Sequence, residues 1–297
     1  MQKYLLSLII LCLFPFISKS QEKVLNIIAI GAHPDDCDIK FGGTAILFSR
    51  MGHNVKFLSI ANGDAGHMEQ GGGVLAQRRF EETQKAASKL GVIYEVLDYH
   101  DGEVIPTLEL RMEIVRQIRD WDADIVISHR PYDYHPDHRY TSAVVQDAAF
   151  MVEVPNFVPG TPALRKTPLF LFFKDHFQTP YPFTPDIAID ITGVIDEKIN
   201  AISSYESQFY EWLPWVSRYE VEIPKDNESR MQWLKNWIIG HPRWSPKVTP
   251  EILISLEKWY GRDEVKKIKY AEAFEICEFG RQPADEEIRM MFPMTGK

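Results

Sequence analysis

The stretch that most constrains this chain is a short apolar run, residues 27–32, that ends in His33-Pro34-Asp35-Asp36. An uninterrupted apolar run of this length is typical of a buried strand in a parallel sheet. In open α/β sheets, ligands bind just outside the carboxyl ends of the strands. The stretch therefore predicts a charged cleft, with His33 and Asp36 as candidate metal ligands and Asp35 as a candidate base. The alternative is a turn followed by helix caps, because Asp and Pro are common turn residues.

A second cluster of the same kind follows another apolar segment. Residues 124–128 predict a strand, and the chain soon reaches His135-Pro136-Asp137-His138. Pro136 suits the first position of a helix, and His135 and His138, three residues apart, can share one face of that helix. Two strand ends of one sheet can meet in one cleft, so the second cluster strengthens the interpretation of the first as a metal site. Taken alone, these residues could be ordinary surface histidines.

Strands and helices alternate along much of the chain, which predicts an α/β fold with a mostly parallel sheet and helices on both faces. The predicted helices cover residues 41–51, 74–90, 107–120, 136 to about 151, and 192–208. After the first strand, the predicted strands cover residues 53–61, 92–97, 124–128, 169–173 and 187–191.

Tryptophan is concentrated after Tyr210, where we expect a Trp-rich, mainly helical C-terminal extension. Six of the seven tryptophans lie there. Trp233 and Trp237, four residues apart on a predicted helix, indicate core packing. For Trp212 and Trp215, packing is the preferred interpretation, and stacking against a sugar is the alternative.

The N-terminus has the layout of a secretory signal peptide. Lys3 precedes an apolar stretch, residues 5–17, and Ser18-Lys19-Ser20 offers a cleavage site before Gln21. We therefore expect residues 1–20 to be removed and the protein to be exported to a periplasmic or extracellular location, with no transmembrane span left. The alternative is an uncleaved anchor, for which the apolar stretch is short. We expect residues 21–297 to form a single domain, with a core of about 25–208 and an extension of about 209–297.

Composition limits the function classes further. A net charge of −9 makes nucleic acid an improbable partner, because nucleic-acid binding depends on basic surfaces. After signal cleavage, Cys37 and Cys277 remain. They could pair in an exported protein, but two cysteines are no disulfide framework. Cys37 is more simply a small buried residue than a metal ligand.

The two clusters together contain the groups that a catalytic zinc site needs. Such a site has three protein ligands, and His33, Asp36 and His138 would supply them. Asp35 could then take a proton from the attacking water. His135 could donate a hydrogen bond or a proton to the developing oxyanion or the leaving amine. Asp137 could orient a ligand histidine without contacting the metal itself.

At these residues the sequence resembles the PIG-L/LmbE-like zinc de-N-acetylases. The family's first motif, Ala-His-Pro-Asp-Asp, is present at residues 32–36, and Gly-Gly-Thr follows at residues 42–44. Asp38 stands where the family more often has Glu. The second motif, His-x-Asp-His with a later Thr, matches residues 135–138 and Thr141.

The resemblance implies a Rossmann-like fold and zinc-dependent removal of acetyl from an N-acetylated amino sugar, such as an N-acetylglucosamine-type glycan or glycoside. By position, the family's metal ligands fall on His33, Asp36 and His138. Its base falls on Asp35, and its oxyanion or acid histidine falls on His135.

The resemblance extends to the helix that follows the second strand, and there it implies a substrate-binding arginine at Arg79. The alternative is a structural ion pair between Arg79 and Glu82, which are three residues apart on one helix. A further segment, residues 270–274, is similar to a C-terminal segment of the family.

Other classes of function remain as alternatives. A nucleotide-binding dehydrogenase would carry Gly-x-Gly-x-x-Gly after its first strand, and His-Pro-Asp-Asp stands there instead. A phosphate-ester hydrolase often needs two metal ions, and His67, His100 and His129 are left unassigned. A carbohydrate-binding protein without activity, or a hydrolase of another ester or amide, could keep the same fold. The sugar, the native metal and the oligomeric state are left open.

Overall fold

The structure, a computed structural model, describes residues 23–218 and 222–295. The predicted signal peptide, residues 1–20, lies outside the described residues. Within the described ranges, none of the helices combines the length and the apolar character that crossing a bilayer requires.

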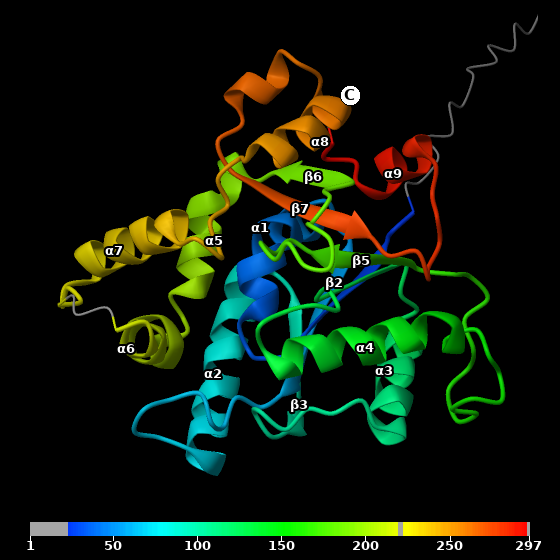
Figure 1. Ribbon diagram of the computed structural model, residues 1–297, viewed down its shortest axis with the longest axis horizontal. Helices are drawn as coiled ribbons and strands as arrows, with labels where there is room; N and C mark the ends of the chain where they lie inside the picture. The colour runs from blue at the N-terminus through cyan, green and yellow to red at the C-terminus, as the bar shows by residue number, and fades with distance from the viewer. Residues whose placement is uncertain (1–22, 219–221, 296–297) are drawn as a thin grey trace, which may run out of the picture.

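A mixed sheet of seven strands organises the described chain, in the order β3-β2-β1-β4-β5-β7-β6 (Figure 1). The strands are β1 (Asn26–Gly31), β2 (Asn54–Ala61), β3 (Ile93–Tyr99), β4 (Ile125–Ser128), β5 (Leu169–Phe173), β6 (Ile187–Asp190) and β7 (Ala271–Ile276). Strands β1 to β5 pair in parallel, whereas β7 runs antiparallel to both β5 and β6. The predicted mostly parallel α/β architecture is confirmed.

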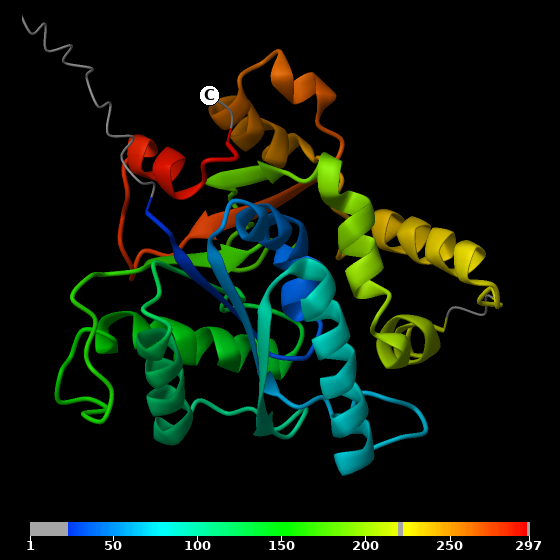
Figure 2. The ribbon, with the colours of Figure 1, turned by 180° about the vertical axis from the view of Figure 1, so that it is seen from behind.

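Helices cover both faces of the sheet. They are α1 (Asp36–Arg50), α2 (Gly72–Leu90), α3 (Leu108–Asp120), α4 (Pro136–Met151), α5 (Ile195–Ile202), α6 (Leu213–Val216), α7 (Asn227–Gly240), α8 (Pro250–Tyr260) and α9 (Asp285–Met291). Strand β1 shows the two layers, because side chains alternate along a strand. Ile27 and Ala29 belong to the core under α1, α2 and α5, which Figure 2 shows in front. Ile28 and Ile30 belong to the core under α3 and α4.

The strand order reverses between β1 and β4, and this reversal positions the site. From β1 the chain moves outward to β2 and β3, and then returns to place β4 on the other side of β1. Ile30 pairs with Ser128 in register, and the Ser128 hydroxyl donates to the Ile30 carbonyl at 2.8 Å. The residues that follow the two strands therefore emerge side by side, where open α/β sheets bind ligands.

The C-terminal part both extends the sheet and packs as an aromatic cluster. Strand β7 comes from this part and lies between β5 and β6, so the predicted core shares its sheet with residues far along the chain. Trp237 lies 5.1 Å from Trp233 and 5.6 Å from Trp244, measured between ring centroids. Phe209 contacts the same cluster. The expected core packing of Trp233 and Trp237 is confirmed.

Helix α1 begins at Asp36, five residues earlier than predicted from Gly42-Gly43. The two glycines lie inside the helix. Gly43 is needed there because the helix packs closely against Ile191. A Cβ atom added at Gly43 would lie only 2.8 Å from Ile191 Cγ2. The early start places Asp36 and Asp38 in the first turn, where the helix dipole favours negative charge.

The prediction of a single helix over residues 192–208 is wrong, because the helical segment is interrupted. A 3₁₀ turn (Thr192–Val194) leads into α5, and a π-helix (Glu206–Trp212) follows after a break. At the break, the carboxylate of Glu82 accepts hydrogen bonds from the Ser207 amide at 2.9 Å and the Ser207 hydroxyl at 2.6 Å. This side chain takes a backbone donor that a continuous helix would use internally.

Cys37 and Cys277 are both free and buried. The thiol of Cys37 donates to the Ala29 carbonyl at 3.4 Å, so it packs against β1 as a small residue.

The packing at Gly43 yields a stability prediction. Gly43→Ala should lower the free energy of unfolding by roughly 1–3 kcal/mol, because the methyl group overpacks against Ile191. Gly73→Ala is the matched control, because Gly73 is also helical but has nothing within 4 Å of an added Cβ. It should be neutral or raise stability by up to about 1 kcal/mol. Urea denaturation measures both variants, and equal stability losses would contradict the packing at Gly43.

Candidate metal centre and active site

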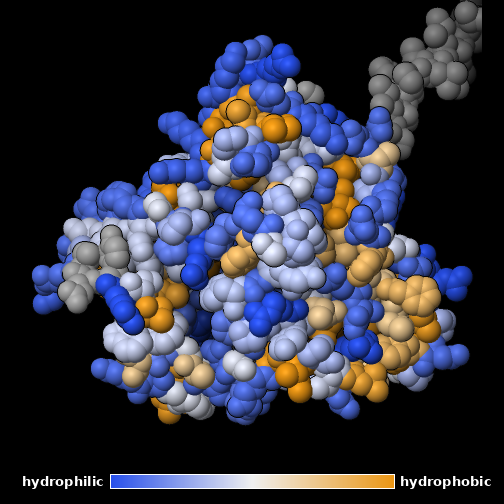
Figure 3. Space-filling view, in the orientation of Figure 1, coloured by the Kyte–Doolittle hydropathy of each residue, from blue (hydrophilic) through white to orange (hydrophobic). Residues whose placement is uncertain are grey.

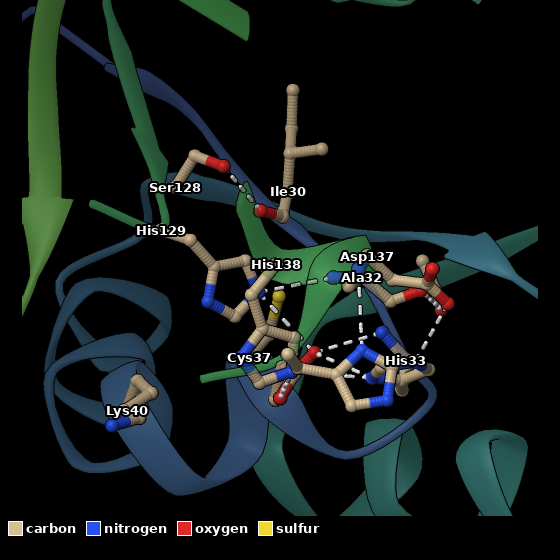
Figure 4. A network of polar contacts seen from close by, with 12 residues as sticks. Ile30, Ala32, His33, Cys37, Lys40, Ser128, His129, Asp137 and His138 are labelled. Atoms are coloured by element: carbon tan, nitrogen blue, oxygen red, sulfur yellow. Dashed lines mark hydrogen bonds and ion pairs between the residues drawn. The ribbon is translucent and has the colours of Figure 1, made fainter. Parts of the chain in front are cut away.

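The predicted ligands His33 and His138 lie side by side beyond the ends of β1 and β4 (Figure 4), and Asp36 lies within 4 Å of both. His33 Nδ1 lies 3.2 Å from His138 Nε2 and 3.6 Å from Asp36 Oδ2. His138 Nε2 lies 3.5 Å from Asp36 Oδ1. Asp36 and His138 are in the first turns of α1 and α4, and His33 is in the turn between β1 and α1.

These separations suit a tetrahedral metal ion. With zinc–ligand bonds of about 2.0–2.1 Å, neighbouring ligand atoms in a tetrahedron are about 3.3 Å apart. The observed distances of 3.2, 3.5 and 3.6 Å are close to that value, although Asp36 faces His138 through Oδ1 and His33 through Oδ2. The donor set of two imidazoles and one carboxylate is also one that catalytic zinc sites use. The residues present therefore fit a divalent metal ion.

Two further carboxylates hold His33 from its other ring nitrogen. Nε2 of His33 lies 3.1 Å from Asp137 Oδ2 and 3.1 Å from Asp101 Oδ1. Asp137 is itself fixed by the Gly102 amide, which donates to it at 2.7 Å. When the ring is neutral and its Nε2–H donates a hydrogen bond to one of these carboxylates, the lone pair of Nδ1 is free for a metal. The predicted orienting role of Asp137 thus has a specific partner, His33.

The surroundings of His33 are strongly negative. Burial disfavours protonation, but Asp101, Asp137 and Asp36 together raise the pKa of His33 well above its usual value. A negative field of this kind also favours a divalent cation in the same place.

His138 has an acidic partner that sequence reasoning missed. Its Nδ1 lies 3.0 Å from Asp133 Oδ1. Burial would raise the pKa of Asp133, but the hydrogen bond with His138 and the charge of His138 hold it far below its usual value. A carboxylate behind a ligand histidine is a common feature of metal sites. The position of Asp133, five residues before His138 in the loop that leads into α4, was the available signal.

His129 is the second residue that sequence reasoning left unassigned. Its ring stacks on His138 with a centroid distance of 4.1 Å and an angle of 14°. Its Nε2 lies 3.2 Å from Asp36 Oδ2 and 3.1 Å from the Ala32 amide nitrogen. Burial lowers the pKa of His129 to about 4, with a further contribution from His138. His129 thus packs as a neutral ring against both Asp36 and His138.

Asp35 and Asp36 are adjacent in sequence but differ in their electrostatic environment. Burial would raise the pKa of Asp36, but the charge of His138 and hydrogen bonds with His129 and His33 hold it well below its usual value. Burial raises the pKa of Asp35 to about 6, although the nearby charge of Arg79 opposes the increase. The two carboxylates are therefore suited to different roles: Asp36 stays ionised, while Asp35 is poised to exchange a proton near neutral pH.

Arg79 contacts the first motif and does not pair with Glu82, so the alternative ion pair is not formed. The guanidinium is buried, donates from Nη2 to the Pro34 carbonyl and lies 3.5 Å from Asp35 Oδ2. Its Nε and Nη1 have no hydrogen-bond partner. Glu82 instead binds Ser207 and lies 3.5 Å from Arg78.

His135 caps helix α4, and the capping hydrogen bond determines which of its ring nitrogens carries the proton. The Asp137 amide donates to His135 Nδ1 at 3.2 Å. When Nδ1 accepts, the proton of the neutral ring is on Nε2. Burial, with further contributions from His33 and His138, lowers the pKa of His135 and favours this neutral form. Nε2–H is then a hydrogen-bond donor at the edge of the metal centre.

A cleft of about 290 Å³ opens over these residues. His33, Asp35, Asp36, His135, His138 and Arg79 all line it. Trp212, Leu213 and Trp244 from the C-terminal part form another wall. Figure 3 shows the surface hollowed between the region of α6 and α7 and the body of the sheet, with hydrophilic residues in blue around it.

The candidate metal-binding groups in the described part of the chain all converge here. The first group is His33, His135 and His138, the second is His33, Asp101, His135 and Asp137, and the third is Asp36, His129 and His138. The predicted ligands His33 and Asp36 thus fall in different groups, and His138 belongs to a group with each of them. The other unassigned histidines have partners elsewhere: His67 contacts Glu211 at 2.8 Å, and His100 contacts Asp64 at 2.6 Å.

Known proteins resemble this chain in sequence and in fold. Residues 28–149 match the PIG-L family model, described as GlcNAc-PI de-N-acetylase. A diacetylchitobiose deacetylase of Thermococcus kodakarensis is 33% identical over 207 residues, which are 67% of this chain and 76% of the relative. This chain belongs to the PIG-L family.

The PIG-L protein is also similar to proteins that carry other names. A 4-oxalmesaconate hydratase of Pseudomonas putida is 25% identical over 195 residues, 62% of this chain and 74% of the relative. The solved structure of N,N'-diacetylchitobiose deacetylase from Pyrococcus horikoshii has a TM-score of 0.61 at 24% identity. The matched region covers 85% of this chain and 84% of the chain in that structure, so the two proteins share the fold.

The metal centre yields a direct prediction. His138→Ala should remove most of the bound metal, because it deletes one of three converging ligands. His100→Ala is the control, because His100 is exposed and does not line the cleft. Elemental analysis after zinc loading and dialysis should find metal in the control and little in His138→Ala. Full metal content in His138→Ala would contradict the assignment of His138 as a metal ligand.

Proposed function

We propose that this PIG-L protein is a metal-dependent hydrolase that removes the acetyl group from an N-acetylated amino sugar. The proposed ion is one Zn²⁺ per chain, and the proposed substrate class is an N-acetylglucosamine-type glycan or glycoside. The observation that carries the proposal is the meeting of a three-ligand donor set with the raised-pKa carboxylate of Asp35 in one cleft. The named activity of the 33% identical relative supports it.

In the proposed reaction, water attacks the acetamide carbonyl and the C–N bond breaks, giving acetate and a free amine. A zinc ion bound by His33, Asp36 and His138 supplies Lewis-acid polarisation and makes water more acidic. Asp35 takes the proton of the attacking water and later delivers it to the leaving amine. The Nε2–H of His135 donates a hydrogen bond to the oxyanion.

Arg79 is the proposed substrate-binding residue. Its Nε and Nη1 are buried donors without a partner, and the side chain lines the cleft. An unpaired buried donor costs free energy unless a ligand satisfies it. A substrate oxygen can fill this position, while Nη2 keeps its bond to Pro34 and its place beside Asp35.

The tryptophan wall is the proposed surface for the sugar ring. Trp212 lines the cleft and stacks on Trp215, with ring centroids 5.4 Å apart and an angle of 20°. The stacking holds the Trp212 ring in a fixed orientation. An aromatic face of this kind can pack against the apolar face of a sugar.

The hydratase relative makes hydration of an unsaturated acid a second candidate reaction. The two differ in product, since only deacetylation releases acetate and a free amine. The higher identity to the deacetylase, 33% against 25%, favours deacetylation. A non-catalytic carbohydrate-binding protein would bind the sugar and release nothing. An acetate-release screen of the zinc-loaded protein over N-acetylated sugars separates the three.

We also propose that the protein is exported, from the pattern of Lys3, the apolar stretch and Ser18-Lys19-Ser20. N-terminal sequencing of the protein secreted by its host should begin at Gln21. A protein that still begins at Met1 would contradict cleavage.

The adjacent aspartates give the sharpest test of the catalytic roles. Asp35→Asn should keep zinc and lose kcat by roughly 10²- to 10⁴-fold, because the amide cannot accept a proton at neutral pH. Asp36→Asn should first lose metal affinity, because a charged ligand becomes neutral. Zinc stoichiometry and kcat for acetate release measure both effects.

Each aspartate variant is the matched control of the other, since the substitution is the same and the positions are adjacent. Metal loss in Asp35→Asn with full retention in Asp36→Asn would reverse the roles. Equal zinc content and equal, modest rate losses would leave both residues as turn formers only.

A further inference from the structure

A buried ion pair lies against the middle of helix α1, outside the cleft. Lys198 comes from α5 and Glu272 from β7, and both side chains are almost fully buried. Lys198 Nζ lies 2.7 Å from Glu272 Oε1. Charges at this depth are costly unless further hydrogen bonds satisfy them, so the other partners of the pair determine what it does.

Those partners are backbone groups of α1. Glu272 accepts hydrogen bonds from two amides inside the helix, Gly43 N at 2.9 Å and Thr44 N at 2.7 Å. Lys198 donates to the Ile39 carbonyl at 2.7 Å. In an α-helix the amide of residue 43 pairs with the carbonyl of residue 39. The ion pair therefore binds both partners of one helical turn, and it does so from two elements that lie far along the chain.

The two glycines of α1 give the pair access to this backbone. A Cβ atom added at Gly42 would lie 3.6 Å from Lys198 Cγ, so the aliphatic stem of Lys198 passes over that glycine. At Gly43, an added Cβ would lie 2.9 Å from Ile191 Cβ. Because neither position carries a side chain, α1 can approach its neighbours closely enough for both charged groups to reach its backbone.

The first turn of the same helix carries a proposed metal ligand. Asp36 lies seven residues before Gly43, which is two turns or about 10 Å along the helix axis. Between them, the Tyr205 hydroxyl donates to Asp38 Oδ2 at 2.8 Å. A functional site needs its groups held within about 0.5 Å. A small shift of the bound turn would therefore be transmitted along the helix to Asp36.

We propose that Lys198 and Glu272 are positioning residues for the metal centre, which fix α1 along its axis and so hold Asp36 at the distance that the ligand histidines require. The inference rests on the proposed metal centre and adds no ligand to it. Apolar residues of similar volume often replace a buried ion pair without loss of stability. The contribution of this pair is accordingly one of geometry, because its hydrogen bonds oppose both sliding and rotation of the helix.

The test replaces both charges at once, by Lys198→Met with Glu272→Met, so that neither charge is left buried alone. Cobalt(II) takes the place of zinc, because its visible absorption reports the geometry of its ligands. The urea midpoint of the double variant should stay close to that of the wild type. Its dissociation constant for Co²⁺ should rise at least about 10-fold, the lower end of what disturbed supporting groups cost a metal site. The shape of its cobalt absorption band should change as well.

The matched control is Arg50→Met with Glu197→Met. It removes an exposed ion pair between the same two helices, α1 and α5, at the other end of α1 from Asp36. Cobalt affinity and spectrum should be unchanged in this control. Glu272→Gln is a second, smaller change that keeps the volume of the side chain, and it should weaken cobalt binding and alter the spectrum in the same direction.

Wild-type cobalt affinity and spectrum in either the double variant or Glu272→Gln would overturn the positioning role. Equal losses of affinity in the control would also overturn it, because they would reflect a general loosening of α1 against α5. A failed metal centre would appear separately, as no cobalt bound by the wild-type protein.

Discussion

The parallel pairing of β1 with β4 is the constraint on which the site depends. The strands run in register at Ile30 and Ser128, on either side of the point where the strand order reverses. Each is followed by a helix whose first turn carries a proposed metal ligand, Asp36 on α1 and His138 on α4. A shift of one residue in this pairing would turn inward side chains outward and separate the two halves of the donor set.

The site also shows how two neighbouring carboxylates can be given different chemistry by their surroundings alone. Asp36 faces two imidazoles, which keep it ionised in spite of burial. Asp35 is as deeply buried but has one cation, Arg79, close by, and its pKa rises to about 6. An acid–base assignment follows from such a separation of pKa values. The central claim is therefore a division of labour between adjacent residues, one holding the metal and one moving the proton.

The sequence was sufficient to predict the sheet and both motifs, because an apolar run ending in His-Pro-Asp is a local signal. It could not place Asp101, which comes from the loop after β3 and reaches His33 only through the folded strand order. It also could not decide between partners for Arg79, because the rotation of α2 determines whether that side chain faces the cleft or Glu82. Strand β7 was missed for the same reason, since its neighbours lie about a hundred residues earlier in the chain.

The location of the metal tests the central claim most directly, because two donor sets share His33. A crystal of the zinc-loaded protein, measured by anomalous scattering at the zinc edge, should show one peak within bonding distance of His33 Nδ1, Asp36 and His138 Nε2. Asp35 should lie close to the ion without binding it. A peak on the other side of His33, between its Nε2, Asp101 and Asp137, would contradict the account.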